Sequence, residues 1–148
     1  TSLKFGYLEV GSLVMPKDDI GGGQIIGRTA YIDQEKKYIL GDHVFKLTVN
    51  NGCSLFIHYL INHDPINKNL RRKANGTAQL GLNRKDVLKQ IISVPVEISE
   101  QERIAKILFS ADRDIEVLKQ KLVCLTQEKN ALMQQLLTGK RRVKVDES

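Results

Sequence analysis

A regular apolar seam in the last third of the chain most constrains what this sequence can fold into. Between residues 104 and 136 apolar side chains recur at alternating steps of four and three, with Lys129 in one slot of the series. The seam consists of Ile104, Leu108, Ala111, Ile115, Leu118, Leu122, Leu125, Leu132 and Leu136. Such spacing keeps a narrow apolar stripe on one side of a helix, and only a second helix can bury a stripe of that shape. The sequence therefore predicts a long, coiled-coil-type helix that pairs with another helix.

Capping signals mark both ends of this helix. Ser99 has the side chain of an N-cap residue, and Glu102 follows three positions later, as in a capping box. Gly139 suits the left-handed position just after a helix, and basic residues at 140–142 favour the negative end of the helix dipole. We therefore predict a helical domain over residues 99–142, a rod of roughly 60 Å, and a short tail over residues 143–148.

Residues 1–98 have the pattern of a different kind of structure. Short apolar or β-branched runs separated by glycine, asparagine and aspartate are typical of strands joined by tight turns. These runs occupy residues 7–15, 24–32, 38–40 and 43–49. Residues 53–62 have helical spacing, and residues 87–96 return to an apolar run that could end in a strand before the long helix. The expected fold class is α+β, with a mixed, β-rich globular domain over residues 1–98, truncated at its start, followed by one long helix.

Composition narrows the class of protein. The chain has 148 residues, 41% of them hydrophobic, which suits one ordinary domain with an appended element. The net charge of +6 suggests an anionic partner. Cys53 and Cys124 are isolated thiols and the histidines lack ligand spacing, so we expect no metal site, no disulfide framework and a cytoplasmic location. No apolar run approaches the roughly 18 residues of a membrane-spanning helix.

Basic and amide side chains are concentrated in residues 67–89, where Asp86 is the only acidic residue. Lysine and arginine can neutralise DNA phosphates, whereas arginine, asparagine, glutamine and threonine can read base edges. A second candidate segment, residues 17–28, has three consecutive glycines before Gln24. The candidate DNA-binding residues are Lys17, Gln24, Arg28, Lys68, Arg71, Arg72, Lys73, Asn75, Thr77, Gln79, Arg84 and Lys85. The alternatives are a solvated loop and helix face for the first segment and a flexible hairpin turn for the second.

Motifs for catalysis and nucleotide binding are incomplete. Residues 21–27 nearly fit the GxGxxG pattern, but Ile26 occupies the position of the third glycine. Gly139 and Lys140 lack the upstream glycine and the following serine or threonine of a phosphate-binding P-loop. The chain also has no serine or cysteine nucleophile motif and no Asn-Pro-Pro-Tyr segment of the kind that adenine methyltransferases use. We expect a non-catalytic chain with no metal site and no cofactor of its own.

Several segments form a recognisable combination. The first is SEQERIA at residues 99–105, with neighbouring matches at 94–95, 107–108 and 112. The second is LMQQLLTGKR at residues 132–141, preceded by Lys129. The others are GTAQ at residues 76–79, followed by 82–83, and the glycine-rich stretch that ends at 27–28. In this combination the chain resembles the carboxy-terminal half of a specificity subunit of type I restriction-modification systems. The helical end is similar to the family's "K..LMQ.LLTGK.R" pattern, and GTAQ is similar to the segment that closes a target recognition domain.

The resemblance implies a function without chemistry. Subunits of this family carry two target recognition domains, held apart by a pair of antiparallel helices, and each domain reads one half of a split site in double-stranded DNA. The helices also dock DNA adenine methyltransferase subunits, which bring S-adenosylmethionine, and a separate restriction and translocase subunit completes the complex. Since this chain has one such domain and one helix, the resemblance implies that the partner helix comes from a second copy or from a second half of the specificity subunit.

Two other functions remain open on the residues alone. A coiled-coil interaction module would use the same seam, with the basic segment serving only solubility. A small DNA-binding regulator would bind DNA with no methyltransferase partner. The DNA sequence that would be read does not follow from residue types, because the pairing of side chains with bases depends on geometry.

Overall fold

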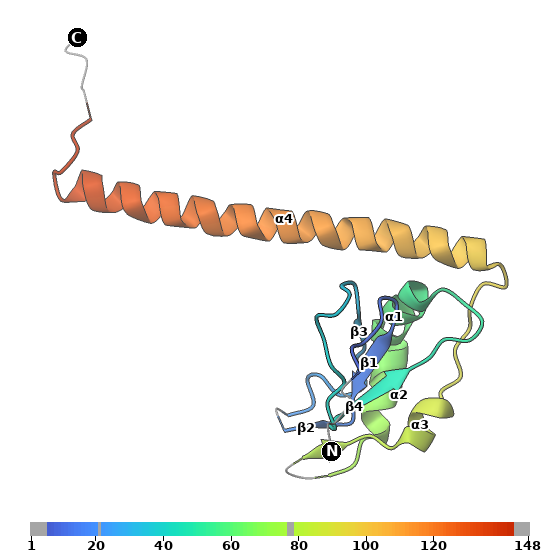
Figure 1. Cartoon of the computed structure of the whole chain (residues 1–148). Helices are drawn as coiled ribbons and strands as arrows, with labels where there is room; N and C mark the ends of the chain where they lie inside the picture. Colours follow the sequence, from blue (N-terminus) through green and yellow to red (C-terminus); the bar gives the residue numbers. More distant parts are fainter. Residues whose placement is uncertain (1–5, 21, 77–78, 144–148) are drawn as a thin grey trace. The chain divides into compact units, whose positions relative to one another are not determined.

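The structure is a computed structural model that describes residues 6–20, 22–76 and 79–143 (Figure 1). Clustering of the backbone separates two compact units, Thr1–Lys106 and Ile107–Ser148. The first unit contains every strand that the described residues form, three short helices and the first turns of a long one. The second unit contains the rest of the long helix and the residues that follow it.

A three-stranded antiparallel sheet forms the centre of the first unit. Strand β1 (Leu13–Pro16) lies between β3 (Ala30–Tyr31) and β4 (Val44–Leu47). In β1, Leu13 and Met15 are fully buried, whereas the residues between and after them are half-buried. This alternation places both buried side chains on one face of the strand.

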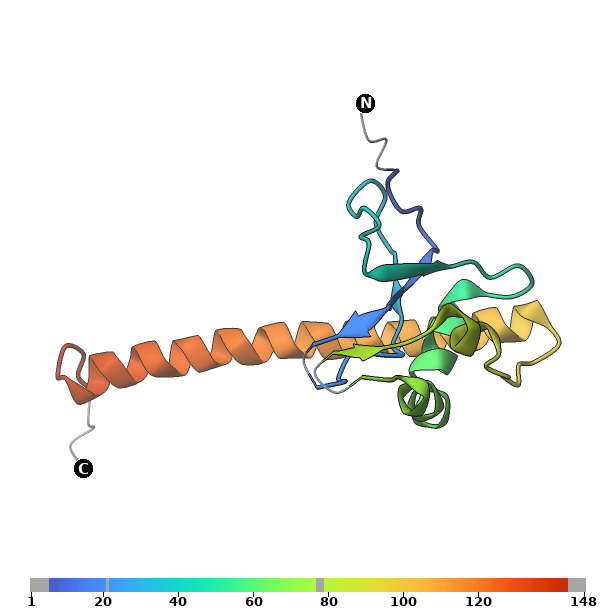
Figure 2. The same cartoon turned by 90° about the horizontal axis from the view of Figure 1, so that it is seen from below.

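A second, two-stranded sheet joins segments that are far apart in the sequence. Strand β2 (Asp18–Asp19) follows β1 directly and pairs antiparallel with β5 (Leu80–Gly81), as Figures 1 and 2 show. Asn75 and Gly81 exchange two backbone hydrogen bonds of 2.9 and 2.8 Å, and the Leu82 amide donates to the Lys17 carbonyl at 2.8 Å. These bonds hold the chain around Lys17 against the chain around Asn75.

Two consecutive helices cover the sheet. Helix α1 (Ser54–Asn62) and helix α2 (Asp64–Lys73) are separated by His63, whose extended backbone ends the first helix and begins the second. Pro65 lies in the first turn of α2, where a missing amide breaks no helical hydrogen bond. A one-and-a-half-turn helix, α3 (Arg84–Leu88), follows β5.

Two hydrophobic clusters meet at β1. The first contains Leu13 and the buried residues Phe56, Ile57 and Ala105, and the second contains Met15, Ile26, Leu70 and Leu82. Since Leu13 and Met15 share one face of β1, helices α1 and α2 both pack on that face, which Figure 1 shows behind the strands. The second cluster also includes the half-buried Val87, which packs α3 against the same core.

The long helix α4 (Ile98–Leu137) has 40 residues, so it extends for about 60 Å. In its first turns Gln101 and Ala105 are buried in the first unit. After the helix, Gly139 adopts a left-handed φ of +73° and its amide donates to the Leu136 carbonyl, as the sequence predicted. Among the described residues, neither α4 nor a shorter helix has an apolar stretch long enough to cross a membrane.

The α+β class is confirmed, but the strands are shorter than the apolar runs that predicted them. The run at residues 24–32 contributes only β3, because most of it forms a loop that packs the buried Ile26 into the second cluster. The run at residues 87–96 forms no strand; it begins as the end of α3 and continues as an extended connection to α4. The helix over residues 54–62 agrees with the helical spacing of residues 53–62.

One expectation about the start of the long helix was wrong. The helix begins at Ile98, and the Glu97 carbonyl accepts the first helical hydrogen bond, from the Gln101 amide at 3.3 Å. Ser99 therefore lies in the first turn and is not the N-cap residue. Ile104 packs against the first hydrophobic cluster, because the first two turns of α4 belong to the first unit. The exposed part of the seam therefore begins at Leu108.

Replacing Leu70 by alanine should strongly destabilise the first unit. Leu70 is 1% exposed in the second cluster, so its truncation leaves a cavity, and we expect the free energy of unfolding to fall by about 2–5 kcal/mol. Urea denaturation followed by circular dichroism measures this change. The control is Ile91→Ala, at a side chain that is 88% exposed, for which we expect a change within about 0.5 kcal/mol. Equal effects of the two substitutions would contradict this description of the core.

Candidate nucleic-acid interface

Helix α2 presents its basic side chains on an exposed face that adjoins its core contacts. Leu70 and Asn67 are buried, whereas Lys68, Arg71 and Arg72 are exposed. Residues three and four apart lie on the same face of a helix, so Lys68, Arg71 and Arg72 form one exposed stripe. Arg71 also follows Asn67 by four positions and therefore lies at the border of the buried stripe. The cations are concentrated toward the carboxyl end of the helix, where the helix dipole favours positive charge.

The amino end of α2 is partly neutralised by its own acidic residue. Lys68 Nζ lies 2.7 Å from a carboxylate oxygen of Asp64, one turn earlier. The hydrogen bond from Lys68 and the charge of its ammonium hold the pKa of the Asp64 carboxyl below its ordinary value, and the charge of Arg28 acts in the same direction. Lys68 is therefore less available to an external anion than the arginines that follow it.

The glycine-rich loop over residues 22–28 is folded around an internal carboxylate. Asp19 is buried in β2, and its side-chain oxygen accepts hydrogen bonds from the amides of Ile25 and Ile26, at 2.8 and 3.3 Å. Two successive backbone amides that converge on one oxygen form an anion-binding concavity. Because Asp19 already occupies these amides, the loop is held as a structural element and does not offer them to a phosphate.

The other end of the loop is held by helix α1. Thr29 and Asn62 form a reciprocal pair, in which the Thr29 amide donates to Asn62 Oδ1 at 2.8 Å and Asn62 Nδ2 donates to the Thr29 carbonyl at 2.9 Å. The Thr29 hydroxyl also lies 3.1 Å from His58 Nδ1. Thr29 is buried, so these bonds fix the backbone directly after Arg28.

The loop packs closely on α2 through two glycines with left-handed backbones. At Gly27, with φ of +74°, an added Cβ would stand 3.0 Å from Leu70 Cβ. At Gly23 an added Cβ would stand 2.7 Å from Leu80 Cδ1 and 3.9 Å from Arg71 Nη2. The loop therefore lies against both α2 and β5. The second candidate segment, which carries the exposed Gln24 and Arg28, thus meets the first one.

A shallow cavity of about 380 Å³ lies beside β2 and β5. Its lining includes Lys17, Asn75 and Gln79 from the predicted set, together with Asp18 and Asn83. The amides of asparagine and glutamine both donate and accept hydrogen bonds, which is the chemistry that reads adenine edges in the major groove. The pairing of β2 with β5 is what brings these side chains together, because Lys17 and Gln79 are far apart in the sequence.

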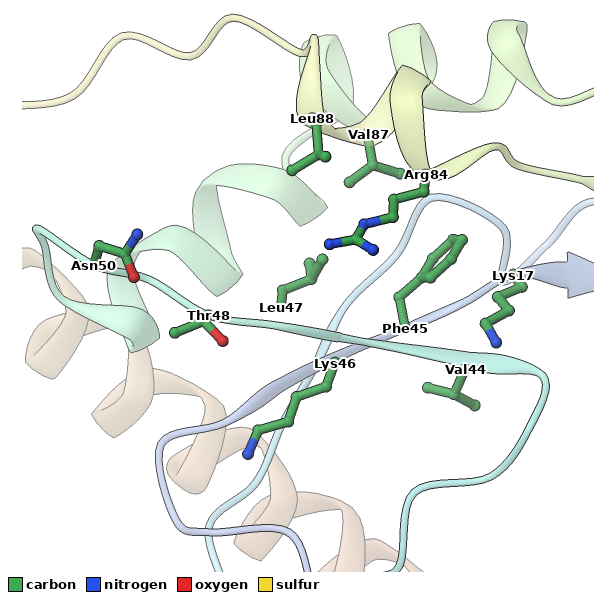
Figure 3. Close-up of a pocket in the computed structure, with 10 residues that line it drawn as sticks. All are labelled: Lys17, Val44, Phe45, Lys46, Leu47, Thr48, Asn50, Arg84, Val87 and Leu88. Carbon is green, nitrogen blue, oxygen red and sulfur yellow. The ribbon is translucent and has the colours of Figure 1, made fainter.

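A larger groove of about 550 Å³ adjoins the same Lys17 (Figure 3). Figure 3 shows Arg84 extending from α3 toward Phe45 and Leu47 of β4, whereas Val44 and Lys46 point the other way. The Lys17 ammonium lies 5.4 Å from the centroid of the Phe45 ring and donates to the Asp42 carbonyl at 2.5 Å. Lys17 is therefore held by contacts within the chain, and Arg84 is the freer cation of this groove.

Among the described residues, several of the predicted cations form no ion pair. The ion pairs among the described residues join His43 to Asp18, Lys46 to Glu9 and Lys68 to Asp64. The predicted cations that are exposed and form no ion pair within the described residues are Arg28, Arg71, Arg72, Arg84 and Lys85. Unpaired surface cations are the groups that can neutralise DNA phosphates and release counterions.

The structure therefore joins the two candidate segments into one region. Gly23 lies close to Arg71 of α2 and to Leu80 of β5, so the loop that carries Gln24 adjoins both elements of the other segment. Lys73 is only half-exposed and donates to Gln90 Oε1 at 3.1 Å, and Lys85 lies on the neighbouring α3. Thr77 lies outside the described residues.

Sequence reasoning missed the side chains that position this region. Asp19 and Asn62 were not identified, because a buried acid and a helical asparagine have no local pattern that predicts their distant partners. Phe45 could have been found, since it alternates with Lys46 along β4 as period-two patterning requires. Among the described residues, no group of three or more histidine, cysteine, aspartate or glutamate side chains is placed to hold a metal ion.

Comparison with known proteins adds one match. Residues 9–127 match the family described as "Type I restriction modification DNA specificity domain", which covers most of the chain. The matched segment includes both candidate segments and the larger part of α4. No solved structure matches this chain.

The double substitution Arg71→Ala and Arg72→Ala should weaken binding to duplex DNA of any sequence. Each lost charge-assisted contact costs about 1.5–3 kcal/mol, and each lost phosphate contact lowers the slope of log affinity against log salt by about 0.9. Fluorescence anisotropy across a salt series measures both quantities. The matched control is Lys36→Ala with Lys37→Ala, which removes two adjacent exposed cations outside both candidate segments. Equal losses in the two variants would contradict a localised interface.

Proposed function

Since the chain belongs to the type I restriction modification DNA specificity domain family, we propose that it reads one half of a bipartite DNA site for a restriction-modification complex. The observation that carries this proposal is the extent of the family match, because residues 9–127 include the basic region as well as most of the long helix. A DNA specificity role accounts for both features, whereas an isolated coiled-coil module leaves the unpaired cations without a purpose.

Within this function the charged and amide residues have different roles. Arg71 and Arg72, with Arg28, Arg84 and Lys85 around them, bind phosphates and hold the domain on the duplex. Asn75, Gln79 and Gln24 have the donor and acceptor groups that distinguish base pairs in the major groove. Lys17, Lys68 and Lys73 support the surface through their contacts with Phe45, Asp64 and Gln90.

The exposed seam of α4 is the proposed helix-pairing surface. From Leu108 to Leu136 its side chains are exposed in the chain alone. A partner helix, antiparallel and from a second copy or a second half of the specificity subunit, buries this seam. In a homodimer the interface is isologous, so the two recognition domains are identical and the split site is palindromic.

The chemistry in such a complex belongs to other subunits. We propose that this chain is non-catalytic and holds no cofactor, and that DNA adenine methyltransferase subunits dock on the helices and supply S-adenosylmethionine. A restriction and translocase subunit completes the complex, which acts on DNA in the cytoplasm. The recognition chain contributes the choice of site and the distance between its halves.

Deleting the gene for this chain should abolish adenine methylation at one bipartite motif in the genome. Long-read sequencing that detects methylated adenine measures the change, and restoring the gene should restore the same motif. A palindromic motif supports the self-paired arrangement, and an asymmetric motif supports a longer specificity subunit. Unchanged methylation would contradict the proposal; duplex binding by the purified chain would then favour a regulator, and no binding would favour an interaction module.

Replacing Leu118 and Leu122 by glutamate should prevent helix pairing. Both side chains lie in the seam, and pairing would bury two unpaired carboxylates. Light scattering measures the mass, which we expect to fall to that of one chain. The matched control is Gln120→Glu with Gln127→Glu, which adds the same charge on the helix face opposite the seam. An unchanged mass in the first variant would contradict a pairing role for the seam.

A further inference from the structure

Gln101 is a buried polar side chain near the start of a helix whose other polar residues are exposed. The residue is only 3% exposed. It lies in the first turn of α4, just after the extended connection at residues 89–97. Its Oε1 accepts a hydrogen bond from the Cys53 amide at 3.0 Å, and its Nε2 donates to the Pro95 carbonyl at 2.8 Å. One side chain thus joins α4 to the segment before α1 and to the connection between α3 and α4.

The surroundings of Gln101 are shaped to receive its amide. Gly52 has a φ of +155°, and a Cβ at this position would stand 3.0 Å from Gln101 Oε1. The Cys53 carbonyl accepts the first helical hydrogen bond of α1, from Ile57, while the Cys53 amide is the one that Gln101 satisfies. One turn later in α4, Ala105 is 1% exposed against Phe56 and Ile57 of the first cluster.

Only an uncharged amide side chain can make both hydrogen bonds of Gln101. A glutamate carboxylate would accept from Cys53 but could not donate to Pro95, and a methionine of similar size would do neither. A buried donor or acceptor without a partner lowers the stability of the fold. Substitutions of glutamine that an exposed helical position would tolerate are therefore unfavourable at Gln101. Gln120, which is exposed and bonds only to Glu116 on its own helix, is such a tolerant position.

We propose that Gln101 is a positioning residue, which ties the first two turns of α4 to the recognition unit and thereby selects the distance between the two half-sites. This inference rests on the proposed function for its second part. The tie itself lies wholly within the first unit, because Cys53, Pro95 and Gln101 all belong to it. We expect Gln101 to contact neither a base nor a phosphate and to act through the helix.

A small movement at Gln101 is large at the far end of the spacer. From Gln101 to Leu137 the helix is continuous, with neither glycine nor proline, and extends for roughly 54 Å. A tilt of about 4° at the start moves the end of such a rod by about 4 Å, which exceeds the ~3.4 Å rise of one base pair. Losing the tie should therefore relax the spacing between half-sites by a base pair without changing which bases are read.

Hydrogen exchange of the whole chain tests the tie without any DNA. In Gln101→Met we expect the Cys53 amide and the amides of residues 101–106 to exchange about tenfold faster, while the amides of β1 keep their protection. Gln101→Glu should keep Cys53 protected and accelerate only residues 101–106, and it provides the test if the methionine variant does not fold. The matched control is Gln120→Met, which should leave all of these rates unchanged. Wild-type exchange at Cys53 in Gln101→Met would overturn the tie.

Methylation mapping of the same variants tests the selection of spacing. In cells that carry Gln101→Met we expect methylation at the normal spacing to fall severalfold and to appear at sites one base pair longer or shorter, with both half-sites unchanged. A merely destabilised chain would lose methylation equally at all sites. Such a uniform loss, or an unchanged spacing despite faster exchange, would overturn the selection of spacing. If the wild-type chain directs no bipartite methylation, the proposed function fails, and the exchange experiment alone decides whether the tie exists.

Discussion

The burial of Leu13 and Met15 on one face of strand β1 is the constraint on which the first unit depends. These side chains belong to different hydrophobic clusters, so a strand of four residues joins the core under α1 to the core under α2. Loss of this alternation would detach both helices from this strand, because a shift of one residue moves both side chains to the other face. The basic helix and the start of α4 are both attached through this strand, by Leu70 and Ala105 respectively.

Internal polar contacts then orient the surface that this core supports. Asp19 occupies the amides of the glycine-rich loop, and the Thr29–Asn62 pair fixes the end of the same loop. A loop with these glycines but without Asp19 would be free to wrap a phosphate; with Asp19 it is a rigid support that lies against α2. The cations exposed to solvent are therefore carried by helices and by a braced loop, which is how a surface can present charges at fixed distances to a regular phosphate backbone.

Sequence periodicity predicted what depends on local pattern and missed what depends on distant partners. The α+β class, the helix at Ser54–Asn62 and the long helix follow from spacings of three and four, which act within one element. The pairing of β2 with β5 was not predictable in this way, since two-residue strands carry no period and these two strands are far apart in the sequence. Gln101 shows the same limit, because a glutamine in a polar helix gives no sign that it is buried. Ile104 satisfied the heptad yet packs on the first unit, since the apolar spacing cannot tell which neighbour covers a side chain.

The seam from Leu108 onward needs a second helix to bury it. Its side chains are exposed over four heptads, and exposed leucines at this density are unfavourable in water. A straight helix drifts by about 20° per heptad relative to a 3.5-residue repeat, so a continuous seam over this length stays on one side only if two helices wind around each other. Lys129 interrupts the seam once, and a polar core residue lowers stability while disfavouring shifted registers. In the proposed function, a helix whose register is restricted at one end by such a residue and tied to its domain at the other by Gln101 would hold a defined length, as the reading of a split DNA site would require.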